Sequence, residues 1–160
     1  MKKNVRASVQ HSPQLGNLIW SYHFITMLTV HGRAISILTI IDEQTQECLL
    51  SIASNRLTAQ NVADELFGLF LRRGIPKNLF AFDDNDEMPK AICEWLDKLE
   101  LNTTFVELKR YGENGYGALF KEKLIKNLFD EKSFASLAEV QQWLANWRNE
   151  HNRSLNLLRV

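Results

Sequence analysis

The sequence IWSYHFITMLTVHGRAISILTIIDEQTQECLLSIA occupies residues 19–53 and alternates strand-forming segments with turns. Its β-branched and aromatic side chains gather in three segments, residues 19–30, 33–41 and 46–53. Turn-forming residues separate the segments, first His31-Gly32 and then Asp42-Glu43-Gln44. Because short turns join antiparallel neighbours, the stretch predicts three consecutive antiparallel strands.

The spacing of apolar residues changes to a helical period after residue 57. Val62, Leu66, Leu69 and Phe70 share one helical face, with Thr58 as a capping residue before them and Gly74 as a stop after them. The same reasoning predicts helices over residues 58–73, 89–100, 118–130 and 136–151. Two further strands are expected over residues 78–82 and 103–108.

This order of elements predicts an α/β fold with a five-stranded mixed sheet and helices on both faces. Three hairpin-connected strands followed by strand–helix units begin few common folds, and the ribonuclease-H-like fold is one of them. The domain should span residues 17–152, between an N-terminal arm at 1–16 and a C-terminal tail at 153–160.

The composition is that of a soluble globular protein, with 45% hydrophobic and 24% charged residues among 160. The longest apolar runs are too short to span a bilayer, and two distant cysteines without a CxxC pair favour a reduced, cytoplasmic location. The charges of the 19 basic and 19 acidic residues cancel, so the formal net charge is zero. A protein that binds DNA through its phosphates usually has a basic surface.

Several short motifs occur in the order found in the integrase core of insertion-sequence transposases, which are relatives of retroviral integrase. They are Trp20-Ser21-Tyr22-His23-Phe24, Leu38-Thr39-Ile40-Ile41-Asp42, Arg73-Gly74-Ile75-Pro76, Phe82-Asp83-Asp84-Asn85, the Gly-rich stretch 112–117, Phe134-Ala135-Ser136-Leu137, and Trp147 before His151-Asn152. Each motif is weak alone, but together they span residues 17–152 with nearly the family spacing. The chain therefore resembles this family.

The resemblance implies a site in which three carboxylates hold two Mg²⁺ ions for attack on a phosphodiester. The three family positions align with His23, Asp84 and Ala118, so only Asp84 is a carboxylate and a weak metal ligand. Glu122, one helical turn beyond Ala118, is an alternative acid. We expect no resident cofactor, and Mg²⁺ or Mn²⁺ only if activity remains.

His23 and Asp84 are expected to meet at the centre of the sheet, because the first and fourth strands are neighbours in this fold. An ion pair would raise the pKa of His23, whereas burial would lower it, and the sequence leaves the sign open. Asp42 is interpreted as a turn residue that ends the second strand.

Three functions follow from these patterns. The first is a catalytically inactive integrase-core relative that binds nucleic acid or supports assembly, with DNA and a second copy of the chain as partners. Basic residues that would follow a DNA backbone are Lys109, Arg110, Lys121, Lys123 and Lys126. The second is a residual metal-dependent nuclease or strand transferase using His23, Asp84 and Glu122. The third is a protein–protein interaction scaffold, which the zero net charge favours.

Overall fold

The computed structural model describes residues 18–82, 87–101, 103–107, 116–130 and 133–158. Its strands are β1 (Ile19–Leu28), β2 (Ala34–Asp42), β3 (Cys48–Ser54), β4 (Asn78–Phe82) and β5 (Thr104–Glu107). Its helices are α1 (Ala59–Arg73), α2 (Glu87–Lys98), α3 (Tyr116–Asp130) and α4 (Leu137–Leu158). The predicted N-terminal arm at residues 1–16 lies outside the described residues.

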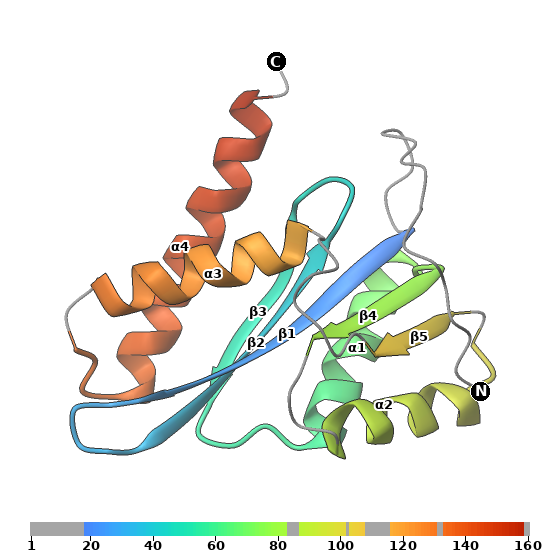
Figure 1. Ribbon diagram of the computed structural model, residues 1–160, viewed down its shortest axis with the longest axis horizontal. Coiled ribbons are helices and arrows are strands. Elements are labelled where there is room, and N and C mark those ends of the chain that lie inside the picture. Colours follow the sequence, from blue (N-terminus) through green and yellow to red (C-terminus); the bar gives the residue numbers. More distant parts are fainter. Residues whose placement is uncertain (1–17, 83–86, 102, 108–115, 131–132, 159–160) are drawn as a thin grey trace.

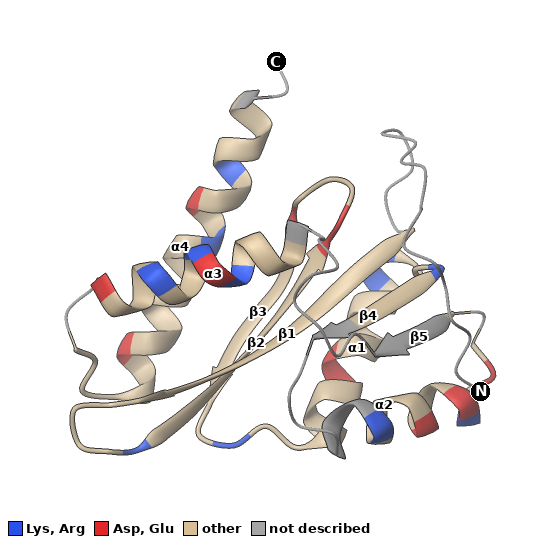
Figure 2. Ribbon diagram, in the orientation of Figure 1, with Lys and Arg blue, Asp and Glu red and all other residues tan. Residues whose placement is uncertain are grey.

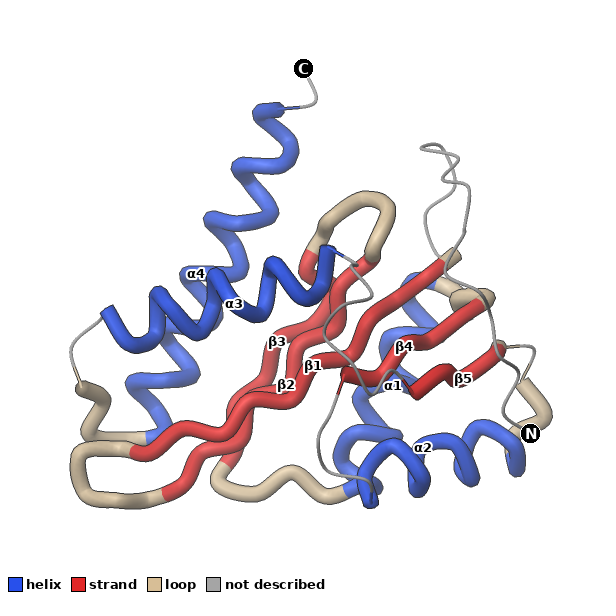
Figure 3. Tube along the Cα trace, viewed as in Figure 1, coloured by secondary structure: helices blue, strands red, loops and turns tan. Residues whose placement is uncertain are grey.

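The strands form one mixed sheet in the order β3-β2-β1-β4-β5, with β1 at its centre (Figure 3). β1 pairs antiparallel with β2, and β2 pairs antiparallel with β3, so the predicted arrangement of the first three strands is confirmed. β4 and β5 pair in parallel, with β4 beside β1. This order places the middle of β1 where strands from both halves of the chain meet.

Helices cover both faces of the sheet (Figure 1). Alternate residues of β1 divide between the two faces, because successive side chains of a strand point in opposite directions. Trp20 and Tyr22 pack in a core with residues of α1 and α2, whereas Ile25 packs in a second core with residues of α3 and α4. The predicted α/β layering is therefore confirmed.

The predicted ends of α1 are confirmed by specific contacts. Thr58 accepts a hydrogen bond from the Asn61 amide at 3.1 Å, and the Asn61 side chain accepts one from the Thr58 amide at 3.1 Å. Gly74 ends the helix with a φ of 86°, a backbone conformation that glycine adopts at little cost.

α4 runs along the outer strand β3 and ends later than the sequence analysis predicted. Residues 153–158, which the sequence pattern predicts as a tail, form the last turns of this helix. No Gly or Pro interrupts this segment, and the Ser154 hydroxyl donates to the His151 carbonyl at 2.7 Å.

Among the described helices, none has both the length and the apolar character needed to cross a membrane.

Polar side chains of α4 cover the backbone of β3. The Asn152 side chain accepts a hydrogen bond from the Cys48 amide at 2.9 Å and donates one to the Cys48 carbonyl at 3.0 Å. The Arg148 guanidinium donates to the Cys48 and Leu49 carbonyls, each at 3.0 Å. These contacts satisfy backbone groups that an outer strand would otherwise leave open.

Candidate functional site

His23 lies on the central strand, at the point where the sheet changes from antiparallel to parallel pairing. It stands opposite Thr39 of β2 on one side and Phe82 of β4 on the other. Its side chain is fully buried, with an exposed fraction of 0%. Asp84, its expected partner, lies outside the described residues.

The imidazole of His23 is held in its neutral form. Burial, and to a smaller extent the positive charge of Lys121, lowers the pKa of His23 from 6.5 to about 3. The Nε2 atom lies 3.0 Å from the Ser21 hydroxyl, which shares the same face of β1. The pKa of His23 is therefore shifted in the direction that burial favours, whereas the expected ion pair with Asp84 falls outside the described residues.

The residue of α3 that packs on His23 is Gly117, which precedes Ala118 in the sequence. A Cβ atom built on Gly117 would overlap both His23 Nε2 and Ser21 Oγ. Real Cβ atoms do not approach other atoms this closely, so only glycine fits here unless these side chains, β1 or α3 shift. The glycine allows the backbone of the helix to lie directly against the strand.

Glu43 connects the start of α3 to the sheet. Its carboxylate accepts a hydrogen bond from the Gly117 amide, with oxygen distances of 3.0 and 3.2 Å. Its own amide donates to the Ile19 carbonyl at 3.0 Å, which fixes its backbone beside the start of β1. The sequence pattern predicts a turn at Glu43 and does not reveal this role, whereas its neighbour Asp42 forms the expected turn by accepting a hydrogen bond from the Gln44 amide.

The alternative acid Glu122 is exposed, on a different side of α3 from Gly117. Five residues rotate an α-helix by about 140°, so positions 117 and 122 do not share a face. The buried residues of α3 that pack in the core against the sheet are Phe120, Leu124 and Leu128. Glu122 is therefore separated from the face of α3 that packs on His23, and the rearranged set of His23, Asp84 and Glu122 stays a prediction because Asp84 lies outside the described residues.

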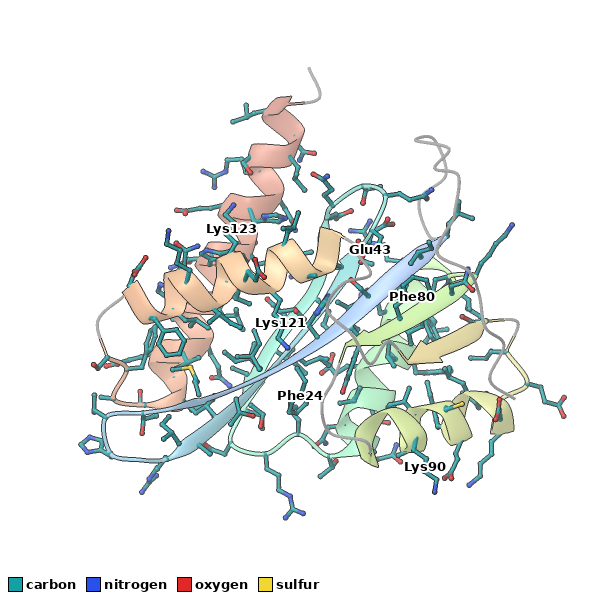
Figure 4. The ribbon with its side chains drawn as sticks, viewed as in Figure 1. Phe24, Glu43, Phe80, Lys90, Lys121 and Lys123 are labelled. Carbon is teal, nitrogen blue, oxygen red and sulfur yellow. The ribbon has the colours of Figure 1, made fainter. Side chains whose placement is uncertain are left out.

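The basic residues of α3 divide between two sides of the helix. Lys121 is half-buried on the side of His23, whereas Lys123 and Lys126 are exposed (Figure 4). The Lys123 ammonium lies 5.9 Å from the ring centre of Trp147. Figure 2 shows acidic residues interleaved with these lysines, and Lys109 and Arg110 lie outside the described residues.

The described residues do not fit a pair of magnesium ions. Mg²⁺ prefers oxygen ligands in near-octahedral geometry, whereas His23 offers a nitrogen and Gly117 offers no side chain. The nearby Glu43 carboxylate already accepts the Gly117 amide. Within the part of the chain that the structure describes, no group of three or more His, Cys, Asp or Glu side chains is placed to hold a metal ion.

The fold is that of integrase and transposase catalytic domains. The catalytic domain of Mos1 mariner transposase superposes on 88% of this chain and 76% of its own, with a TM-score of 0.61 at 12% identity. The HTLV-2 integrase catalytic core domain in complex with magnesium, in a trimeric form, covers 87% of this chain and 84% of its own, with a TM-score of 0.56 at 12% identity. These matches confirm the fold that the motifs implied.

Insertion-element proteins are similar in sequence. The 31.7 kDa protein of insertion element IS407 from Burkholderia multivorans is 24% identical over 140 residues, which are 88% of this chain and 50% of that protein. The 39.2 kDa protein of IS476 from Xanthomonas euvesicatoria is 23% identical over 137 residues, which are 86% of this chain and 40% of that protein. The chain thus spans half or less of these relatives, and no family model matches it. The resemblance to insertion-sequence proteins is confirmed.

Proposed function

We propose that this chain is an integrase-core relative that does not cut DNA and acts as a nucleic-acid-binding or assembly module. The observation that supports this function is the packing of Gly117 against His23 and Ser21. We assign Gly117, rather than Ala118, to the position of the third family carboxylate. Two of the three positions then hold a neutral imidazole and a glycine, which together do not bind two Mg²⁺ ions.

Binding to DNA would use the exposed side of α3. Lys123 and Lys126 lie one turn apart on that side, and their charges suit contacts with a phosphate backbone. Lys121 lies near His23 and is therefore not counted among the residues of this DNA-binding side. Since basic and acidic residues balance over the chain, we expect weak binding that depends on salt.

Assembly with a second copy is the other part of the proposal. The HTLV-2 integrase core is described in dimeric and trimeric forms, and this chain shares its fold. Leu71 and Phe67 lie one turn apart on α1 with exposed fractions of 73% and 47%, which is an apolar surface suited to a protein partner. Sedimentation over a range of concentrations tests this part.

A cytoplasmic location, supported by the free cysteines Cys48 and Cys93, completes the proposal.

A cleavage experiment tests the loss of catalysis. Purified protein is incubated with supercoiled plasmid and with duplex oligonucleotides in Mg²⁺ and in Mn²⁺, and nicked or cut products are quantified. We expect no metal-dependent cleavage. Cleavage that persists in the control Asp130→Ala but disappears in Asp84→Ala would contradict the proposal and favour a residual nuclease.

A binding experiment tests the nucleic-acid part. Fluorescence anisotropy with a labelled duplex at about 50 mM salt should show several-fold weaker binding when Lys123 and Lys126 are both replaced by Glu. Lys77→Glu, at an exposed position before β4, is the matched control and should bind as the wild type does. Equal affinities for all proteins would leave assembly as the function.

A further inference from the structure

The junction between α3 and the sheet contains a polar connection that the proposed function does not require. The first amides of an α-helix have no partners within the helix and carry a partial positive charge. In α3 the amide of Gly117 is bonded to the carboxylate of Glu43, the residue directly after β2. This carboxylate is 74 residues away in sequence, so the bond fixes tertiary structure rather than a local turn.

We propose that Glu43 and Gly117 form a latch that holds the start of α3 on the sheet without a metal ion. In a site with carboxylates on the strands and on this helix, a bound metal would join the helix to the sheet through its ligands. Here Glu43 joins the same elements by a direct hydrogen bond to the helix backbone. The bare Cα of Gly117 lets the helix lie close enough for that bond.

Three contacts make the latch rigid. The Glu43 amide donates to the Ile19 carbonyl at 3.0 Å, which anchors the acceptor to the first residue of β1. Both carboxylate oxygens lie within hydrogen-bond distance of the Gly117 amide, at 3.0 and 3.2 Å. His23 is buried against the same helix residue, so the strand fills the space beside the bond. Figure 4 shows Glu43 at the first turn of α3, with Lys121 further along the helix.

The latch predicts that a metal adds nothing to the docking of α3. It also predicts that the docking depends on the carboxylate of Glu43 more than on other acidic groups nearby. Glu47 is a suitable comparison, because it belongs to the same connection between β2 and β3 but binds Arg73 at the surface. Both statements hold whether or not the chain binds DNA.

Amide hydrogen exchange measured by NMR tests the latch on the intact chain. In Glu43→Ala we expect the Gly117 amide to exchange at least tenfold faster, while the amides of the β1–β2 ladder keep their wild-type rates. Glu47→Ala should leave the Gly117 amide unchanged. Addition of Mg²⁺ or Mg²⁺ with a chelator should leave the wild-type rate unchanged.

A second variant keeps the test decisive if Glu43→Ala does not fold. Glu43→Gln retains the shape and an acceptor oxygen but loses the charge, so the Gly117 amide should exchange several-fold faster in an otherwise native spectrum. An unchanged Gly117 amide in Glu43→Gln and Glu43→Ala would overturn the latch. Slower exchange of this amide in the wild type on addition of Mg²⁺ would also overturn it, because the metal would then be the connection.

Discussion

His23 occupies the space that a side chain on Gly117 would need, so β1 and α3 meet through a strand histidine and a helix glycine. The two residues lie 94 positions apart in the sequence. This relationship excludes an acidic side chain from the helix position next to His23 unless the neighbouring side chains, the strand or the helix move.

Gly117→Ala should destabilise the protein, although alanine is the better helix former by about 1 kcal/mol. The added methyl group would overlap His23 Nε2 and Ser21 Oγ, and overpacking of this kind costs about 1–3 kcal/mol. Urea unfolding measures the free energy of unfolding of both proteins. The double variant His23→Ala/Gly117→Ala should lose less than the sum of the two single losses, and strict additivity would show that these residues do not touch.

Gly68→Ala is the matched control in another helix. Gly68 lies in α1, where an added Cβ would meet only the end of the flexible Arg72 side chain at 3.3 Å. We expect this change to stabilise the protein by about 0.5–1 kcal/mol in the same urea experiment. A loss at Gly68 equal to that at Gly117 would mean that the effect is not specific to the contact with His23.

The free energy of unfolding should fall as the pH drops from about 6.5 towards 3. His23 has its folded pKa lowered from 6.5 to about 3, so between these values the unfolded chain binds a proton that the folded chain does not. The contribution of His23 to the free energy of unfolding is therefore fully present above pH 6.5. It decreases by about 1.4 kcal/mol for each pH unit between 6.5 and about 3. His151, whose pKa burial also lowers, adds to the slope.

Urea unfolding of His23→Gln between pH 7 and 4 separates the contribution of His23 from the rest. Glutamine keeps a polar group near Ser21 but does not titrate, so the loss of stability with falling pH should be smaller than in the wild type. His31→Gln, in the exposed turn after β1, should keep the wild-type slope. An identical slope in His23→Gln and wild type would mean that His23 is not buried in its neutral form.

Asn152→Ala should lower the free energy of unfolding by about 1–3 kcal/mol. The change removes both hydrogen bonds between this side chain and the backbone of Cys48, and leaves an outer-strand amide and carbonyl without that partner. Thermal unfolding should show a lower midpoint. Asn156→Ala, one turn later in α4 at an exposed position, should leave the midpoint unchanged, and equal effects of both changes would contradict the role of Asn152.

His23→Asp should destabilise the metal-free protein, because it buries a second carboxylate near Glu43. Mg²⁺ or Mn²⁺ should recover part of this loss by binding only the folded state. Thermal unfolding of His23→Asp and of the uncharged His23→Asn, with and without metal, measures the effect. Equal recovery in both variants would show that the metal acts elsewhere on the protein.

Most of the fold was predictable because it depends on local patterns. The strands around His31-Gly32 and the start of α1 at Thr58 follow from side-chain type and spacing, and the structure confirms them. The end of α4 was predicted too early, since the sequence pattern contains no stop signal between residues 151 and 158. The polar contacts of Arg148 and Asn152 with β3 join distant segments, which no local pattern reveals.

The site was predicted less well, for physical reasons. His23 was found through its motif, but its burial and lowered pKa depend on what packs over it. Gly117 belongs to a Gly-rich stretch that predicts a loop, so its place at the start of α3 was missed. Glu43 follows directly after a strand and resembles a turn residue, and only the tertiary structure shows that its carboxylate reaches α3.

The most direct test of the account is titration of Mn²⁺ into ¹⁵N-labelled protein, because paramagnetic Mn²⁺ broadens the amide signals of residues near its binding site. We predict that the signals of Ser21, His23 and Gly117 keep their intensity at millimolar Mn²⁺, apart from uniform losses shared by exposed residues such as Asn156. Selective loss of the Ser21, His23 and Gly117 signals at lower Mn²⁺ would contradict the claim that this site no longer holds metal.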